Sequence, residues 1–224
     1  MEFEIVNTKD GSKSVFSKVF DAAYHSWYGA VTENKYIFIE NGLVYKHMQG
    51  LETIKVLEIG YGTGLNAILT GIYAVDNNVE VIYSGVDKYE CPREILDELN
   101  YTAFFDAKYI DLIKHINNVQ YDTAIKLHEK FTLIKSLASL KDTALRQNYD
   151  VIYFDAFSPR QVPYMWTLEV FKEMYKALNP GGVLVTSCTQ SQFKRDLKAA
   201  GFEVEEIPEA TGKREMTRGT KKFE

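Results

Sequence analysis

Short apolar runs alternate with amphipathic stretches from Lys55 onward. The apolar runs cover residues 56–59, 81–86, 131–134, 151–154 and 183–186. Several are almost continuously apolar, as strands covered by helices on both faces require. The stretches between them predict helices over residues 66–75, about 92–100, 136–146, 166–178 and 190–200. This alternation predicts a doubly wound α/β fold, Rossmann-like, around a mostly parallel sheet.

The last part of the chain adds two strands to this prediction. Asn179-Pro180-Gly181-Gly182 ends one helix before the next strand, because proline cannot continue a helix and glycine accepts a tight stop. Residues 202–207 predict a further strand, and residues 214–218 can pair with it as an antiparallel edge. The expected sheet therefore has about seven strands.

The region before Lys55 has a different pattern. Residues 36–40 and 43–47 flank Asn41-Gly42, which is the strongest short-range signal for a β-hairpin. At 224 residues the chain is long enough for one ordinary domain and short for two. We expect residues 1–54 to form a hairpin or lid segment packed on the sheet, and residues 55–224 to form the main domain.

Composition excludes several classes of protein. Apolar residues make up 46% and charged residues 25%, as in soluble globular proteins. No apolar stretch approaches the roughly 20 residues that span a bilayer, and the start lacks a signal-peptide pattern, so we expect a cytoplasmic protein. Cys91 and Cys188 lie outside any CxxC pattern, and the four histidines have no metal-binding spacing. We expect no metal and two structural thiols.

Charge is unevenly distributed along the chain. The net charge of −5 argues against broad nonspecific binding to nucleic acid, which needs surplus cations on one face. Residues 211–224 nevertheless carry five cations and two acids. This basic tail permits a local phosphate contact, and a solvated polar terminus is the alternative.

The sequence VLEIGYGTGLNA places three glycines between the first parallel strand and its helix. Glycines let backbone approach a ligand, and the helix N-terminus offers unpaired N–H groups, which indicates a nucleotide-like ligand. The spacing is G-x-G-x-G, and Leu65 stands where a dinucleotide fingerprint has its last glycine. Glu58 would repel a pyrophosphate, whereas it suits the ammonium and sulfonium of S-adenosylmethionine.

Asp87 ends the second strand, where an acid in such folds binds ribose hydroxyls. The predicted cofactor contacts are Glu58, Gly60, Gly62, Gly64, Asn66, Asp87 and Lys88. A purely structural turn is the alternative for the glycine run. A nicotinamide oxidoreductase is the fold-level alternative, and the glycine spacing disfavours it.

Several segments resemble one family. They are TKDGS from Thr8, AYHSWYGAVTENKYIFIENGL from Ala23, EIGYGTGLN, DAFSPRQVPYMW and GKREMTRG, which ends at Gly219. Together they resemble the methyltransferase half of the bifunctional tRNA 5-methylaminomethyl-2-thiouridine biosynthesis enzyme and its single-domain relatives. The resemblance implies methyl transfer from S-adenosylmethionine to the exocyclic amine of 5-aminomethyl(-2-thio)uridine at the tRNA wobble position.

The resemblance also sets expectations about what differs here. The bifunctional relatives carry a flavin-dependent oxidase, for which this chain has no room and no GxGxxG, so we expect no FAD and no oxidase activity. Relatives usually have Gly-Asp after the third strand, where Ser136-Leu137 stand in this sequence. We therefore expect different adenine contacts.

Asp155 is the predicted catalytic residue. It follows the fourth strand, at the carboxyl edge where ligands bind in such sheets, and the resemblance points to the same residue. A carboxylate there can accept a hydrogen bond from the substrate amine, or take its proton. Support of the loop through Pro159 and Pro163 is the alternative role.

The predicted substrate contacts come from three segments. They are Tyr24, Glu33, Phe157, Pro159, Trp166, Lys213 and Arg214. Phe157 can stack on a base, Trp166 can instead anchor the core, and the basic pair suits tRNA phosphate. A lone histidine such as His25 is more often a local hydrogen-bonding residue than a catalyst.

Two other functions stay open at this point. One is a methyltransferase of the same fold that acts on a small-molecule or protein amine, which the acidic net charge favours. The other is a non-catalytic module that binds S-adenosylmethionine or tRNA. We favour a monomer.

Overall fold

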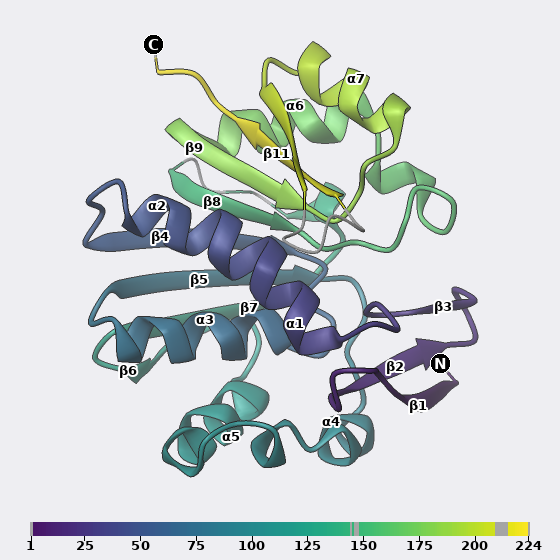
Figure 1. The fold of residues 1–224 in the computed structure, drawn as a ribbon, viewed down its shortest axis with the longest axis vertical. Coiled ribbons are helices and arrows are strands. Elements are labelled where there is room, and N and C mark those ends of the chain that lie inside the picture. Colours follow the sequence, from purple (N-terminus) through teal and green to yellow (C-terminus); the bar gives the residue numbers. More distant parts are fainter. Residues whose placement is uncertain (1, 144, 146–147, 209–214, 224) are drawn as a thin grey trace.

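The structure, a computed structural model, describes residues 2–143, 145, 148–208 and 215–223. Within them, eight strands form one sheet in the order β10-β11-β9-β8-β4-β5-β7-β6 (Figure 1). The strands are β4 (Thr53–Ile59), β5 (Glu80–Asp87), β6 (Ala124–His128), β7 (Phe131–Leu137), β8 (Tyr149–Phe154), β9 (Leu178–Thr186), β10 (Glu203–Pro208) and β11 (Glu215–Thr220). The five central strands β9, β8, β4, β5 and β7 run parallel, which confirms the predicted doubly wound, mostly parallel sheet.

Side chains of the central strands alternate between two apolar layers. Val151 and Tyr153 face one layer, whereas Ile152 and Phe154 face the other. Helices α3 (Leu65–Asp76) and α5 (Ile110–Asn118) belong to the first layer, and α6 (Leu168–Ala177) and α7 (Ser191–Ala199) to the second. Because both faces of the strands are buried, consecutive strand residues are apolar.

The predicted hairpin at Asn41-Gly42 is wrong. Residues 30–47 form one helical segment across the sheet, made of α1 (Ala30–Asn34), the π-helical η1 (Lys35–Val44) and α2 (Tyr45–His47) (Figure 1). Gly42 faces the sheet, where an added Cβ would lie 3.1–3.2 Å from Tyr153, Val185 and Val151. The glycine permits a close helix–sheet contact, and this tertiary packing outweighs the local turn signal.

An N-terminal β-elaboration does exist, but other residues build it. Strands β1 (Phe3–Asn7), β2 (Lys13–Ser17) and β3 (Ala22–Ala23) form a separate antiparallel sheet. Helix α4 (Arg93–Leu99) contacts this small sheet, which lies at the α1 end of the long helical segment (Figure 1). The small sheet is therefore next to the carboxyl ends of the central strands.

Three further predictions need correction. The helix predicted over residues 136–146 is not formed by the described residues 136–143 and 145, because β7 continues to Leu137 and a 3₁₀ turn, η4 (Leu140–Asp142), follows it. The predicted antiparallel strand corresponds to β11, which pairs with β10 as predicted but lies between β9 and β10, so β10 is the edge strand instead. Strand β6, an antiparallel neighbour of β7, was not predicted, and its sequence AIKLH has a weak apolar pattern.

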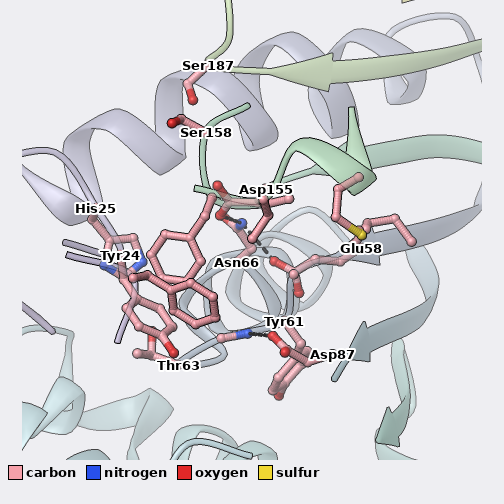
Figure 2. A pocket seen from close by; sticks show the side chains of 18 of the residues that line it. Tyr24, His25, Glu58, Tyr61, Thr63, Asn66, Asp87, Asp155, Ser158 and Ser187 are labelled. Carbon is pink, nitrogen blue, oxygen red and sulfur yellow. Dashed lines mark hydrogen bonds between the residues drawn. The ribbon is translucent and has the colours of Figure 1, made fainter. Parts of the chain in front are cut away.

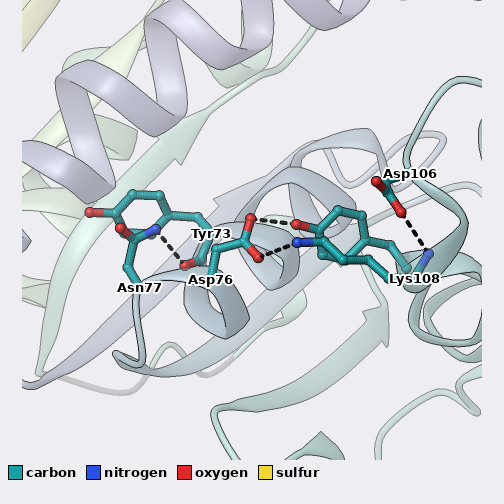
Figure 3. A network of polar contacts seen from close by, with 6 residues as sticks. Tyr73, Asp76, Asn77, Asp106 and Lys108 are labelled. Carbon is teal, nitrogen blue, oxygen red and sulfur yellow. Dashed lines mark hydrogen bonds and ion pairs between the residues drawn. The ribbon is translucent and has the colours of Figure 1, made fainter.

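Short helices connect the main elements. They are η2 (Tyr101–Ala103), η3 (Ala107–Tyr109) and η5 (Pro163–Met165). Asp76, at the end of α3, accepts hydrogen bonds from the side chains of Lys108 and Tyr109 (Figure 3). These contacts fix η3, and with it the start of α5, against α3. No helix among the described residues is long and apolar enough to cross a membrane.

The close packing of Gly42 gives a first prediction. Gly42→Val inserts a branched side chain between η1 and the sheet, and overpacking of this kind costs about 1–3 kcal/mol of unfolding free energy. Glu40→Val, on the exposed side of the same helical segment, should change stability by less than about 0.7 kcal/mol. Urea unfolding of the two variants measures both values, and equal stabilities would contradict this packing.

Candidate active site

A cavity of about 410 Å³ lies at the carboxyl ends of β4, β5 and β8 (Figure 2). After β4 the chain continues to β5 on one side, and β8 returns on the other side of β4. Ligands in open α/β sheets bind at such a switch in strand order. The volume lies within the roughly 300–1,000 Å³ of small-molecule sites. The cavity is therefore the candidate site.

The glycine loop after β4 forms the floor of the cavity. Gly60 has a φ of 92°, and an added Cβ would lie 2.4 Å from the backbone oxygen of Asp155. The two strand ends are also joined directly, because the Asp155 N–H donates to the Ile59 carbonyl at 2.9 Å. Only glycine allows this approach between β4 and β8. Gly62 and Gly64 continue the loop, also at positive φ.

Asp87 is fixed at the end of β5 by backbone donors. Its carboxylate accepts from Gly62 N–H at 2.8 Å and from Tyr89 N–H at 2.9 Å (Figure 2). Burial raises the pKa of Asp87, and these hydrogen bonds counteract that effect. Lys88 follows it on the cavity wall. The predicted ribose acceptor thus lies in the cavity with its orientation set.

The side-chain amide of Asn66 joins two carboxyl groups at the centre of the cavity. Its Nδ2 donates to Glu58 Oε1 at 2.8 Å and to Asp155 Oδ2 at 2.9 Å (Figure 2). Its Oδ1 accepts from Asn34 Nδ2 at 3.0 Å. Glu58 Oε2 accepts a further hydrogen bond from the Tyr83 hydroxyl at 2.7 Å. Every polar atom of the Asn66 side chain therefore has a partner.

Burial alters the acidity of both carboxyl groups. It raises the pKa of Glu58 well above the ordinary value. Burial, and then the negative charge of Glu33, raise the pKa of Asp155 to about 7, while the hydrogen bond from Asn66 opposes the shift. An acid whose pKa lies near neutral can hold or release a proton under working conditions. Neighbouring carboxyl groups also favour a positively charged ligand.

Aromatic side chains close one side of the cavity. The Phe157 ring stacks on Phe20 at 4.5 Å between ring centroids, and Tyr24 meets Phe157 edge-on at 5.0 Å. Phe20 and Tyr24 come from the N-terminal segment, whereas Phe157 follows β8. His25 Nδ1 is 2.8 Å from Ser14 Oγ, and burial lowers its pKa to about 4, so the ring is neutral at pH 7.

Two predicted substrate residues lie outside the cavity wall. Trp166 is buried among Phe154, Phe171 and Phe193, and its Nε1–H donates to the Phe157 carbonyl at 2.7 Å. This hydrogen bond ties Trp166 to the loop that carries Phe157, which favours the alternative that Trp166 anchors the core. Pro159 lies in the turn after Phe157 and also does not line the cavity. Lys213 and Arg214 lie outside the described residues.

The TKDGS segment caps the helix that brings Glu33 and Asn34 to the cavity. The first N–H groups of α1 donate to side chains of this segment: Ala30 to Thr8 Oγ1 at 3.4 Å, Val31 to Ser12 Oγ at 3.3 Å, and Thr32 to Asp10 Oδ2 at 3.0 Å. These groups have no partner inside the helix. Caps usually come from the residue just before a helix, so sequence spacing gave no signal for this one.

Asn34 is a cavity-lining residue that the sequence analysis missed. The hairpin prediction hid it, because Ala30, Asn34 and Phe38 share a face only when residues 30–38 are helical. Glu33 was predicted, and it lines the cavity with Oε2 accepting from Ser26 N–H at 3.0 Å. A buried polar residue within an apolar helical pattern is the signal that could have identified Asn34.

Residues 98–222, more than half of the chain, match the model of a family described as S-adenosyl-L-methionine-dependent methyltransferase. The chain belongs to this family. The matched residues include Asp155, whereas the glycine loop after β4 and Asp87 precede them.

Individual relatives are similar over most of the chain. The tRNA 5-methylaminomethyl-2-thiouridine biosynthesis bifunctional protein MnmC of Paraburkholderia phytofirmans is 25% identical over 219 residues, which cover 91% of this chain and 33% of that protein. The protein of the same name from Leptospira interrogans is 28% identical over 218 residues, again covering 91% and 33%. The chain thus spans about a third of the length of these relatives.

A solved structure supports the fold. MNMC2 from Aquifex aeolicus superposes with a TM-score of 0.78 at 23% identity, covering 100% of this chain and 72% of that one. The resemblance stated from the sequence motifs is confirmed by these matches. The residues present also fit the methyl donor of the family: a cationic ligand suits Glu58 and Asp155, and the glycine loop leaves room beside them.

The helix cap yields a second prediction. Asp10→Ala removes acceptors for Thr32 and Ser12, and should cost about 1–2 kcal/mol of stability at pH 7, as loss of a helix cap does. Asp97→Ala, which removes only an exposed ion pair with Arg93, should cost less than about 1 kcal/mol. Chemical unfolding compares the two.

The pH dependence of the stability difference tests whether Asp10 acts as a charged cap. Hydrogen bonds from Ser12 and Thr32 lower the pKa of Asp10 below the ordinary 3.8. A carboxylate with a lowered folded-state pKa stabilises the fold above its unfolded pKa, and this contribution is lost as the pH falls below it. The stability gap between wild type and Asp10→Ala should therefore narrow below about pH 4. A gap that is constant down to pH 3 would contradict the cap.

Proposed function

We propose that this chain transfers a methyl group from S-adenosylmethionine to the exocyclic amine of 5-aminomethyl(-2-thio)uridine at the wobble position of tRNA, giving the 5-methylaminomethyl form. The observation that carries the proposal is the half-buried Asp155 carboxyl, held beside Glu58 by Asn66 in a cavity with an aromatic wall. The names of the relatives supply the substrate class.

The methyl donor is assigned to the floor of the cavity. The backbone of Gly60, Gly62 and Gly64 would lie against it, Asp87 would accept from the ribose hydroxyls, and Glu58 would face its cationic end. Lys88 and the segment 138–140 would flank the adenine, where Ser139 offers a hydroxyl on the cavity wall. Ser136 and Leu137, which replace the expected Gly-Asp, end β7, and Leu137 is exposed.

Asp155 would orient the substrate amine. When bound, S-adenosylmethionine supplies a methyl carbon activated by its sulfonium. A primary amine is mostly protonated at pH 7 and must lose a proton before its lone pair is free. An ionised Asp155 can accept a hydrogen bond from the amine and take up that proton, since its pKa of about 7 is close to the working pH.

The aromatic wall would hold the uridine. Phe157 and Tyr24 line the cavity from opposite segments, and an unstacked base of a single-stranded loop can stack on such rings. Glu33 lies on the same wall and adds negative charge toward Asp155. We expect no flavin and no metal at this site.

A same-fold methyltransferase for a small-molecule or protein amine is the second candidate. The net charge of −5 favours it, because a cationic amine needs no basic surface for recruitment. It uses the same donor site and the same carboxyl group. Only the substrate distinguishes the two candidates.

Nucleoside analysis after methyl transfer tests the proposal. The protein is incubated with labelled S-adenosylmethionine and tRNA carrying 5-aminomethyl-2-thiouridine, beside Asp155→Asn and the exposed control Asp97→Asn. We expect one added methyl group on that nucleoside, a rate lower by about 10²- to 10⁴-fold in Asp155→Asn, and an unchanged rate in the control. No methylated nucleoside despite donor binding would contradict the tRNA assignment and favour the second candidate.

A further inference from the structure

Two large aromatic side chains are exposed beside the cavity. Trp27 is 60% exposed and Tyr28 is 61% exposed. They follow directly on Tyr24, His25 and Ser26, all three of which line the cavity. Two large exposed aromatic side chains that are consecutive in the sequence and directly follow cavity-lining residues indicate a surface for interaction.

The loop that carries these rings is held in place. Lys9 N–H donates to the Trp27 carbonyl at 3.0 Å, and Tyr28 N–H donates to Ser26 Oγ at 3.1 Å. Ser26 N–H in turn donates to Glu33 Oε2 at 3.0 Å. The backbone that carries the rings is thus fixed on the cavity wall, so little conformational entropy is lost when a partner binds.

A cation accompanies the rings. Lys9 Nζ lies 4.7 Å from the centroid of the Tyr28 ring, and Lys9 is exposed. Aromatic faces next to a lysine are the combination with which proteins bind single-stranded nucleic acid, because bases stack on the rings and the cation neutralises phosphate. A protein partner would favour a wider apolar patch without a charge at its centre.

We propose that Lys9, Trp27 and Tyr28 form a stacking platform for a nucleotide adjacent to the modified uridine. This inference rests on the proposed function. The cavity of about 410 Å³ must hold the donor and one extruded nucleoside, so neighbouring nucleotides of the loop stay at its rim. The platform begins one residue after Ser26, which lines the cavity, and is therefore within reach of such a neighbour.

Steady-state kinetics with modified tRNA test the platform. Trp27→Ala and Tyr28→Ala should each raise KM for tRNA by roughly 5- to 100-fold, the loss expected for one stacked base, with kcat within about twofold of wild type. Trp27→Phe should restore most of the affinity because it keeps a ring. Met48→Ala is the matched control, since Met48 is 83% exposed but follows α2 at the opposite end of the helical segment (Figure 1).

Two further readouts separate stacking from an effect on the cavity. The affinity for S-adenosylmethionine should be unchanged in the alanine variants, and so should the rate with a free 5-aminomethyl-2-thiouridine nucleoside. An unchanged KM for tRNA, an equal loss with tRNA and nucleoside, or a change in oligomeric state without a change in KM would each overturn the platform. If wild type itself does not methylate tRNA, it is the proposed function that fails.

Discussion

The side-chain amide of Asn66 is the contact on which the site depends. It donates both of its N–H groups to carboxyl groups, Glu58 on β4 and Asp155 after β8, and its oxygen accepts from Asn34 on α1. An amide whose two N–H groups and oxygen all have hydrogen-bond partners is held in one orientation. The contact therefore requires a fixed relative position of four elements. They are the ends of β4 and β8, the first turn of α3 and the start of the long helical segment. A shift of any of them would leave a buried polar group unpaired, at about 1–3 kcal/mol.

The N-terminal segment is part of the site because it holds the helix that carries Asn34. Its TKDGS loop caps α1, and α1 places Asn34 against Asn66 and Glu33 on the cavity wall. Phe20 and Tyr24 then pack against Phe157. Residues that lie more than 100 positions apart in the sequence thus form one wall.

Much of the sheet and of the cavity lining could be predicted from the sequence. Doubly buried parallel strands read as apolar runs, and the rule that ligands bind at their carboxyl ends placed Glu58, Asp87 and Asp155 together. Gly60 was predicted to let the backbone approach a ligand, and in the structure it also admits the backbone of Asp155, a contact that the sequence did not predict.

Contacts between distant segments limited the rest of the prediction. Asn41-Gly42 has the local signal of a turn, but packing of Gly42 on Val151 and Val185 decides in favour of a helix. The roles of Asp10 and Asn34 depend on partners 22 and 32 residues away, which spacing rules do not cover. Trp166 illustrates the same limit, because a tryptophan near a site can equally be the anchor beneath its loop.

Direct titration of the Asp155 carboxyl tests the central claim, that burial, the negative charge of Glu33 and the Asn66 amide together set its acidity. The ¹³C chemical shift of this carboxyl, assigned by its loss in Asp155→Asn, is followed by NMR from pH 4 to 9 in wild type and Asn66→Ala. The structure predicts a midpoint near 7 in wild type and a higher midpoint in Asn66→Ala, because the lost hydrogen bond favours the charged form. A midpoint near 4, the value of an ordinary aspartate, in both proteins would contradict it.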